Sequence, residues 1–433
     1  MSEPSPAGGI APDHGPAPSA IPSPSAPGPL EGLRVVEVAG PLGEYAGKLL
    51  ADLGADVILV EPPGGAARRR LGPFLGDRSG DDRSLSFAYL HTSKRGIVLD
   101  LDDAQGQTTF RRLAATADVV LESEPVGTMT RRGLDHAALS AGHPALVTTS
   151  ITPFGSDGPY ADYEATDLVL MALGGLLYLG GYSDTSPVRA AGDQAILAAG
   201  QFAAIGTLLA VLTAEQTGQG QVVDVSAQEC VVMAHETAVP FWDLEQTVRR
   251  RGGEDQRQAG VGVYPCQDGE VYLLAGGLGL FWDELVDWLE QEGVDDAAEL
   301  REPRWRTIEW IASPAGKAVF RERFAQLAMR RTKAELYADA KRQRIPLCPI
   351  ATPADLVASP QLLARHFFVD LAEGLPGTTL RLPGAPYQPS DSPWRIQRPA
   401  PALGEHTDEL LAELTDVRAP AMAPDAAAAL TAR

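Results

Sequence analysis

Apolar runs and amphipathic stretches alternate along the first half of the chain. Short runs rich in valine, isoleucine and leucine predict strands at residues 33–38, 55–61, 96–101, 118–122 and 145–151. Between them, the spacing predicts helices at residues 46–53 and from about Asp103 to Ala117. Strands that alternate with helices in this way indicate a parallel sheet covered on both faces. The first half is therefore predicted to form an α/β fold.

The longest apolar run follows Asp193 and predicts a helix that ends near residues 217–220, where glycine supplies a stop. By length alone this run is able to cross a membrane. It contains Gln201, Thr207 and Thr213, however, and it stands alone in the chain. We therefore interpret it as a buried helix of a large α/β core.

A second domain is expected after a glycine- and charge-rich linker at residues 249–260. Residues 263–274 then indicate a hairpin with its turn at Asp268 and Gly269. Trp282, Trp288 and Trp305 mark a helical region with its own small core. The predicted division is a disordered tail at 1–29, a large domain at 30–225, a linking helix at 226–249, a small domain at 250–345, a return to the large domain at 346–415 and a mobile tail at 416–433.

Composition and charge narrow the possible partners. The chain has 433 residues, 44% of them hydrophobic, so it can bury a large core. Its formal net charge of −21 disfavours nucleic acid and anionic membranes, which require a cationic surface. Cys230, Cys266 and Cys348 lie far apart and are expected to be free thiols in a reducing cytoplasm. The N-terminal residues lack the cationic start and apolar centre of a signal peptide, which also favours the cytoplasm.

Common nucleotide-binding and hydrolase motifs do not occur in the sequence. Neither of the two glycine-rich phosphate-binding motifs, G-x-G-x-x-G and G-x-x-x-x-G-K-[ST], occurs between a predicted strand and a predicted helix. The nucleophile-elbow motif is also missing, and the seven histidines include no pair with metal-ligand spacing. What remains is a group of carboxylates near glycine-rich turns, namely Asp157, Asp162, Glu164, Asp167, Asp184 and Asp193.

Asp193 has two possible roles. It follows Ala190, Ala191 and Gly192 directly before the long helix, so its carboxylate is placed to cap the first turn. A carboxylate that is ionised, oriented and shielded from water can instead attack an acyl group and form a mixed anhydride. The small neighbours of Asp193 would let a bulky thioester approach. The local residues leave both roles open, and the second requires at least one carboxylate oxygen to face a cleft.

Six segments along the chain carry the pattern of a known family. They are LEGLRVVEVAGP (30–41), LADLGADV (50–57), SKRGIVLDL (93–101), FGSDGPY (154–160), TGQGQVVDV (217–225) and RPAPALGEHTD (398–408). Together they resemble the class III CoA-transferases, also called the CaiB/BaiF type, over about residues 30–415. The resemblance implies a Rossmann-like large domain with a parallel sheet, a smaller α+β domain and an interlocked homodimer.

The resemblance further implies an enzyme that moves CoA from an acyl-CoA donor to a carboxylic acid acceptor. In this family the nucleophilic aspartate follows a glycine just before the long helix, which is the position of Asp193. It would form a mixed anhydride and then an aspartyl-CoA thioester, with CoA as substrate and product and with no metal or tightly bound cofactor. Asp167 matches a second acidic residue, upstream of a Gly-Gly turn, that would hold or polarise the nucleophile.

Residues for CoA binding are also implied by the resemblance. CoA carries phosphates, which cationic groups and loop backbone must receive. The residues assigned are Val38, Ala39, Lys94, Arg95, Ser123 and Arg131. The site is expected between the large domain of one subunit and the small domain of the other.

Departures from related sequences leave alternatives open. α-Methylacyl-CoA racemases share this fold and place a histidine base immediately before the residue equivalent to Asp167, where this chain has Thr166. Racemisation is therefore disfavoured, but a racemase or other acyl-CoA isomerase remains an alternative, as does a CoA-ester-binding protein without turnover. Some transferases have glutamine in place of Val38. The segment at 252–260 is poorer in glycine than the flap of several members, so its role as a lid is open.

Overall fold

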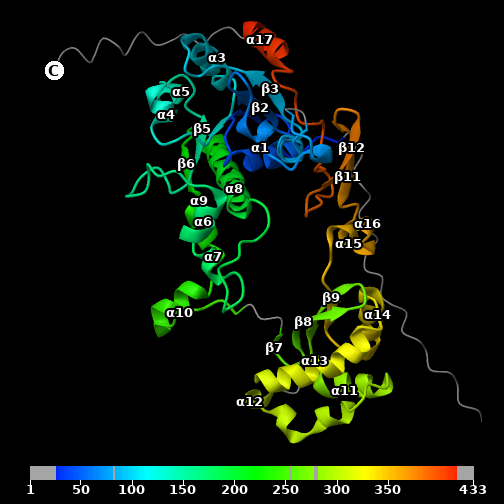
Figure 1. Cartoon of the computed structure of the whole chain (residues 1–433). Helices are drawn as coiled ribbons and strands as arrows, with labels where there is room; N and C mark the ends of the chain where they lie inside the picture. Colours follow the sequence, from blue (N-terminus) through cyan, green and yellow to red (C-terminus); the bar gives the residue numbers. More distant parts are fainter. Residues whose placement is uncertain (1–25, 81–82, 253–255, 277–280, 417–433) are drawn as a thin grey trace, which may run out of the picture. The chain divides into compact units, whose positions relative to one another are not determined.

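The computed structural model describes residues 26–80, 83–252, 256–276 and 281–416, which form two compact units (Figure 1). Unit 1 consists of Met1–Glu164, Ile196–Ala227 and Phe367–Arg433. Unit 2 consists of Ala165–Ala195 and Gln228–His366. Unit 1 therefore draws on both ends of the chain, and unit 2 lies between them in sequence.

A six-stranded sheet forms the centre of unit 1. Its strands are β1 (Arg34–Val38), β2 (Asp56–Glu61), β3 (Arg95–Val98), β4 (Val119–Glu122), β5 (Val147–Thr152) and β6 (Val222–Ser226). They lie in the order β3-β2-β1-β4-β5-β6, and every neighbouring pair is parallel. This is the order of a doubly wound Rossmann-type sheet, whose ligands bind where the order reverses, here between β1 and β4. The predicted α/β fold with a parallel sheet is confirmed.

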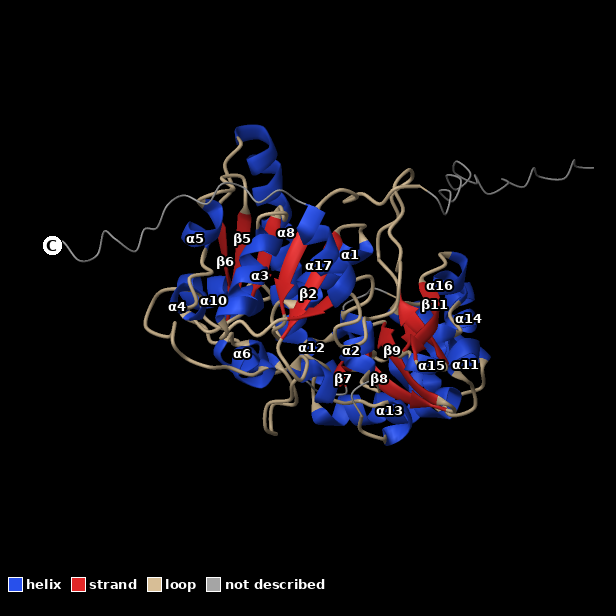
Figure 2. Ribbon diagram, turned by 90° about the horizontal axis from the view of Figure 1, so that it is seen from above, coloured by secondary structure: helices blue, strands red, loops and turns tan. Residues whose placement is uncertain are grey.

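Helices cover both faces of this sheet (Figure 2). One face packs against α3 (Ala104–Ala114) and α17 (Thr407–Asp416), which contribute Phe110 and Leu410 to a shared core. The other face carries α1 (Glu44–Asp52), where Gly47 lies directly against Glu37 of β1. Because neighbouring residues of a strand point to opposite faces, both sets must be apolar, which explains the continuous valine and isoleucine runs.

The long apolar helix, α8 (Gln194–Thr217), packs on the same sheet. A Cβ atom on Gly206 would lie 2.9 Å from a methyl carbon of Val223 in β6. Thr207 Oγ1 lies 2.7 Å from Thr149 Oγ1 of β5 and also donates to a carbonyl oxygen within the helix. Among the described residues, α8 is the one helix long and apolar enough to cross a membrane. Its packing against two strands places one face of α8 in the core of unit 1. The opposite face carries exposed side chains such as Ile205 and Leu209, so the predicted buried helix is buried on one side only.

Shorter elements complete unit 1. They are the 3₁₀ turns η1 (Ala67–Arg70) and η2 (Leu75–Asp77), the helices α2 (Leu85–Leu90), α4 (Thr128–Arg131) and α5 (His136–Ser140), and the strands β11 (Phe368–Leu375) and β12 (Thr378–Pro383). The last two strands form an antiparallel hairpin. Leu375, Leu380 and Leu382 of that hairpin pack with Ala88 of α2, so the returning C-terminal segment has a small core of its own.

Unit 2 contains a four-stranded sheet in the order β10-β9-β8-β7. Its strands are β7 (Gln256–Gln258), β8 (Val261–Cys266), β9 (Gly269–Leu274) and β10 (Leu347–Pro349), all antiparallel to their neighbours. Its helices are α11 (Trp282–Gln291), α12 (Ile308–Ile311), α13 (Pro314–Ala328), α14 (Lys333–Gln343), α15 (Pro353–Val357) and α16 (Pro360–Ala364), with 3₁₀ turns η3 (Ala297–Arg301) and η4 (Pro303–Arg306). The three predicted core tryptophans are buried here, and Trp282 stacks on Trp305.

A separate group of short helices in unit 2 lies before and after α8 in the sequence. These are α6 (Asp167–Leu173), α7 (Leu176–Leu179), α9 (Ala227–Val232) and α10 (Ala238–Glu245). The linking helix predicted at 226–249 is thus two helices, of which α9 begins one residue before unit 2. The break between them coincides with His235, a buried residue whose ring lies beside Gly175.

The predicted hairpin, the 252–260 segment and the two predicted tails can also be compared with the structure. The hairpin exists, but Cys266 pairs with Gly269, so its turn consists of Gln267 and Asp268, one residue earlier than predicted. Asp268 in this turn accepts a hydrogen bond from the N–H of Lys333 through its carboxylate. In the segment at 252–260, whose role as a lid was left open, residues 256–258 form strand β7, whereas 253–255 lie outside the described residues. Nearly all of both predicted tails also lies outside them.

Candidate active site

Asp193 occupies the last position before α8 and is partly buried. The preceding residue, Gly192, has a φ of +80°, a left-handed conformation that glycine adopts without steric cost. The side-chain amide of Gln194 donates to the carbonyl oxygen of Ala191 at 2.8 Å and closes the turn. The backbone therefore turns sharply into the helix at Asp193, and this turn explains the glycine in front of it.

Asp167, the first residue of α6, is held against the start of α8. Its side chain is 6% exposed, and Oδ1 accepts a hydrogen bond from the N–H of Ala195 at 2.8 Å. The first N–H groups of a helix have no partner within it, and a carboxylate there also interacts favourably with the helix dipole. Asp167 thus takes part of the capping role considered for Asp193. The structure brings the two predicted catalytic residues to the same helix end.

The turn after α6 is tightly packed. A Cβ atom on Gly174 would lie 2.6 Å from a methyl carbon of Val231 in α9, and Gly175 has a φ of +82°. The side-chain amide of Gln228 donates to the carbonyl oxygen of Leu173 at 2.9 Å. Because α6 is fixed at its C-terminal end in this way, Asp167 at its N-terminal end has a defined position.

In unit 1, three of the predicted CoA-binding residues lie at the point where the strand order reverses. Val38 ends β1, Ala39 follows it, and Ser123 follows β4, the neighbouring strand. A Cβ atom on Gly40 would lie only 2.3 Å from Ser123 Oγ, so the two strand ends are in close contact. The Ser123 hydroxyl is buried and makes no hydrogen bond with any residue that the structure describes. It is therefore available to a ligand.

Arg131 lies nearby in sequence, at the end of α4. Its side chain is exposed, and Nη2 donates to Thr128 Oγ1 at 2.8 Å. Other residues of the same segment line a cavity of about 470 Å³ together with residues of β4, β5 and β6. They include Gly127, Thr130, Glu122 and Ser150. Arg131 is thus an accessible cation in a segment that lines a cavity against strands β4, β5 and β6.

Lys94 lies in the interior of unit 1, with no exposed surface. Its Nζ lies 2.7 Å from Glu37 Oε2, 3.0 Å from the carbonyl oxygen of Glu44 and 3.2 Å from His91 Nδ1. Lysine is almost never fully buried unless it is paired. Burial raises the pKa of Glu37 to about 7, against the opposing charge of Lys94. The ammonium group is therefore occupied by internal partners.

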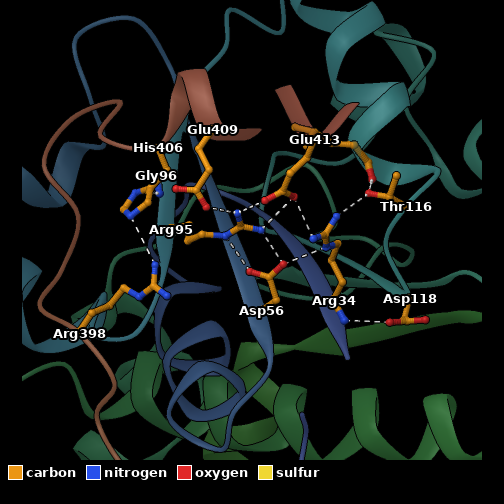
Figure 3. Close-up of polar contacts among 11 residues, drawn as sticks. Arg34, Asp56, Arg95, Gly96, Thr116, Asp118, Arg398, His406, Glu409 and Glu413 are labelled. Atoms are coloured by element: carbon orange, nitrogen blue, oxygen red, sulfur yellow. Dashed lines mark hydrogen bonds and ion pairs between the residues drawn. The ribbon is translucent and has the colours of Figure 1, made fainter. Parts of the chain in front are cut away.

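Arg95 is likewise engaged by carboxylates (Figure 3). Its guanidinium group bonds Asp56 of β2, and it reaches Glu409 and Glu413 of α17 at 2.8 and 2.6 Å. These contacts tie the C-terminal helix to the edge strand of the sheet. The expected contacts of Lys94 and Arg95 with CoA stay predictions, and both side chains have other partners in this structure.

Two arginines near Asp193 were not selected from the sequence. Arg189 Nη1 lies 3.4 Å from Asp167 Oδ2, and Arg251 donates to three carbonyl oxygens of the segment that precedes Asp193. Arg189 stands only four residues before Asp193, so its contact with the carboxylates of the site could have been predicted from the sequence. Arg251 is distant in sequence, and its contacts follow from the fold alone.

Within the described part of the chain, no three His, Cys, Asp or Glu side chains are grouped to hold a metal ion. The three cysteines are free, with Cys230 and Cys266 buried and Cys348 exposed. Burial raises the pKa of the Cys230 thiol to about 11, so this thiol is a poor nucleophile.

Comparison with known proteins identifies relatives along nearly the whole chain. The sequence profile of CoA-transferase family III matches residues 30–407. Succinyl-CoA:(R)-benzylsuccinate CoA-transferase subunit BbsE of Thauera aromatica is 40% identical over 88% of this chain and 93% of its own length. Succinate–glutarate CoA-transferase of Agrobacterium fabrum is 34% identical over 90% of this chain and 96% of its own length.

A solved structure agrees with the sequence comparison. A CaiB/BaiF family protein from Brucella suis is 29% identical, covers 90% of this chain and 100% of its own, and superimposes with a TM-score of 0.77. The profile match, the two transferases and this fold all point to one family. The chain belongs to CoA-transferase family III and is a CoA-transferase.

Proposed function

We propose that the protein transfers CoA from an acyl-CoA donor to a carboxylic acid through covalent intermediates on Asp193. One Asp193 oxygen attacks the donor thioester carbonyl, the C–S bond breaks, and CoA leaves as a thiolate. The thiolate then attacks the Asp193 carbonyl of the mixed anhydride, which releases the donor carboxylate and leaves an aspartyl-CoA thioester. The acceptor carboxylate repeats these two steps in reverse order, so acyl-CoA is formed and Asp193 is regenerated.

The arrangement at the start of α8 carries this proposal. Asp167 accepts the Ala195 N–H in the first turn of α8, directly beside Asp193 in the chain. The two residues differ in exposure, because Asp167 is buried and Asp193 is only partly so. We assign Asp193 as the nucleophile and Asp167 as the residue that fixes the helix end next to it.

We propose that CoA binds at the carboxyl ends of β1 and β4. The Ser123 hydroxyl and the backbone at Val38 and Ala39 would contact it, and Arg131 would receive phosphate. The buried, unbonded Ser123 hydroxyl and the adjacent cavity support this placement. Lys94 and Arg95 are not included in the proposed site, since their internal carboxylate partners already satisfy them. No metal or tightly bound cofactor has a role in these steps.

We infer that the donor is succinyl-CoA and the acceptor another carboxylic acid. Succinyl-CoA or succinate appears in the names of the relatives from Thauera and Agrobacterium, and the first of these acts on benzylsuccinate. The protein is proposed to act in the cytoplasm as an interlocked homodimer, without nucleic acid or membrane. Because the Thauera relative is named as a subunit, a dimer with a second, related chain is the alternative outcome of an assembly measurement.

Replacing Asp193 by asparagine tests the proposed chemistry. D193N should lower kcat for CoA transfer from succinyl-CoA by about 1,000-fold or more, because loss of a covalent nucleophile removes the main reaction path. The matched control is D184N, which changes an exposed aspartate of the same segment and should leave kcat within about twofold of wild type. Full activity in D193N would end the proposal. A racemase would instead show α-proton exchange in deuterated water without an acceptor acid.

A further inference from the structure

The segment between α7 and Asp193 has no helix or strand of its own. Residues 180–193 form turns and extended backbone, and most of their side chains are exposed. Its two ends meet, because the N–H of Val188 donates to the carbonyl oxygen of Gly180 at 3.1 Å. Tyr182 and Thr185 lie in the loop between them. The stretch at residues 178–188, called here the pre-nucleophile loop, starts with the last two residues of α7 and ends five positions before Asp193.

One side chain from a distant part of unit 2 binds this loop at three places. Arg251 donates from Nε to the carbonyl oxygen of Tyr182 at 3.1 Å and from Nη1 to that of Tyr178 at 3.2 Å. A third bond runs from Nη2 to the carbonyl oxygen of Thr185 at 3.1 Å. Three nitrogens of one planar guanidinium group are thus used on three backbone acceptors of a single loop.

The chemistry of arginine suits this arrangement. Its five donors have a fixed geometry, so three bonds are formed at the entropy cost of ordering one side chain. Within the described residues, the structure gives Arg251 no carboxylate partner, and its positive charge faces carbonyl dipoles and the ring of Tyr178. Hydrogen bonds from a charged donor are about twice as strong as neutral ones. The Arg251 side chain is therefore used to bind the backbone of the loop and not to form an ion pair with a described residue.

The loop determines where the backbone enters Asp193. From the C-terminal side the position is fixed by α8 and by the bond between Asp167 and Ala195. From the N-terminal side the chain passes through Gly192, whose conformation is permissive, and Ala191 and Arg189 each make a local contact. Upstream of these, the Arg251 contacts hold the loop from which the chain enters that turn. A misplacement of about 1 Å in a reacting group can lower a rate about 100-fold.

We propose that Arg251 is a positioning residue for CoA transfer, which holds the pre-nucleophile loop and thereby orients the Asp193 carboxylate. The proposal rests on the function proposed above for Asp193. It assigns Arg251 no contact with substrate. Loss of the guanidinium group should therefore slow acylation of Asp193 and leave substrate binding largely unchanged.

The test compares R251Q and R251K with R250Q, the matched control, in the full-length protein. Arg250 is exposed and makes no hydrogen bond or ion pair with a described residue. R251Q should increase hydrogen exchange of amides in 178–193 and lower kcat about 10- to 100-fold, with KM for succinyl-CoA within about twofold. R251K, which retains the charge but offers a single nitrogen, should fall between R251Q and wild type. R250Q should match wild type.

Three results would overturn the proposal. Faster exchange in the loop with unchanged kcat would show that the loop does not orient the reaction, and a lower kcat with unchanged exchange would show that Arg251 acts on substrate directly. If both the hydrogen exchange of the loop and kcat were unchanged, Arg251 would neither hold the loop nor influence the reaction. If R251Q fails to fold, R251K together with guanidinium ion added to R251A provides the same readouts, and added guanidinium should restore part of kcat. The exchange measurement remains informative even if D193N proves active.

Discussion

At the scale of single residues, burial and partners decide what a charged side chain does. Lys94 and Arg131 have the same charge, yet Lys94 is fully buried against Glu37 and Arg131 is exposed beside a cavity. Removing one partner of a buried ion pair commonly costs about 3–5 kcal/mol, because the other charge is left without compensation. The Lys94–Glu37 pair is therefore a structural feature that supports β1 and α1, the elements on either side of Gly40.

Glutamine at position 37 should change how stability depends on pH. Burial raises the pKa of Glu37 from 4.5 to about 7, so the folded protein keeps a proton that the unfolded chain has released. The stability contributed by this group is present below pH 4.5 and is lost as the pH rises through about 7. The unfolding free energy of wild type should therefore fall relative to E37Q across this range, as measured by urea unfolding.

A matched control has the opposite sign. Hydrogen bonding to Arg95 lowers the pKa of Glu413, so its contribution is present at neutral pH and is lost on acidification. Wild type should therefore gain stability relative to E413Q as the pH rises. If wild type also gains stability relative to E37Q as the pH rises from 4.5 to 7, the charge of Lys94 has a larger effect on the pKa of Glu37 than burial has. The account of this pair would then be wrong.

At the scale of elements, α8 has a face that unit 1 does not cover. Ala199, Ala203 and Thr207 are buried on one side. Ile205 and Leu209, four residues apart and so on one face, are 54% and 61% exposed. Large exposed apolar patches mark interaction sites on proteins. This face supports the proposed dimer, since a second copy of the chain or a related subunit would cover it.

The variant I205E/L209E should lose the dimer, because two charges on the interface would have to be buried without partners. Light scattering coupled to size-exclusion chromatography measures the mass directly. The control Q105E/T108E adds two carboxylates to the exposed side of α3 and should keep the mass of wild type. A monomeric wild type, or an I205E/L209E variant with unchanged mass, would contradict the proposed interface.

At the scale of the whole molecule, periodicity predicts most of unit 1. The valine-rich runs became β1, β2 and β4, and the amphipathic pattern at residues 46–53 became α1, because these signals are local. The strand order and the contact between Gly40 and Ser123 are long-range and could be expected only through family resemblance. In unit 2 the tryptophan core followed from composition, whereas the helix break at His235 depends on packing against Gly175.

The candidate site was predictable to a similar degree. The neighbours of Asp193 in sequence, a glycine before a long helix, made it a candidate, and the family resemblance made it the expected nucleophile. Asp167 was assigned through the family resemblance alone. The hydrogen bond between Asp167 and Ala195 joins residues far apart in the chain and required the fold. Lys94 was assigned to phosphate through the family resemblance. Lys94 is buried because it pairs with Glu37, which is itself fully buried. The valine-rich sequence around Glu37 predicts a buried strand but not a buried ion pair.

Trapping the covalent intermediate tests the central claim most directly. Wild-type protein incubated with succinyl-CoA and hydroxylamine, without acceptor acid, should lose activity and carry a hydroxamate on the peptide that contains Asp193, as mapped by mass spectrometry. D193N should remain unlabelled under the same conditions. A protein that transfers CoA at the normal rate while hydroxylamine leaves Asp193 unmodified, or modifies a different carboxylate, would contradict the account.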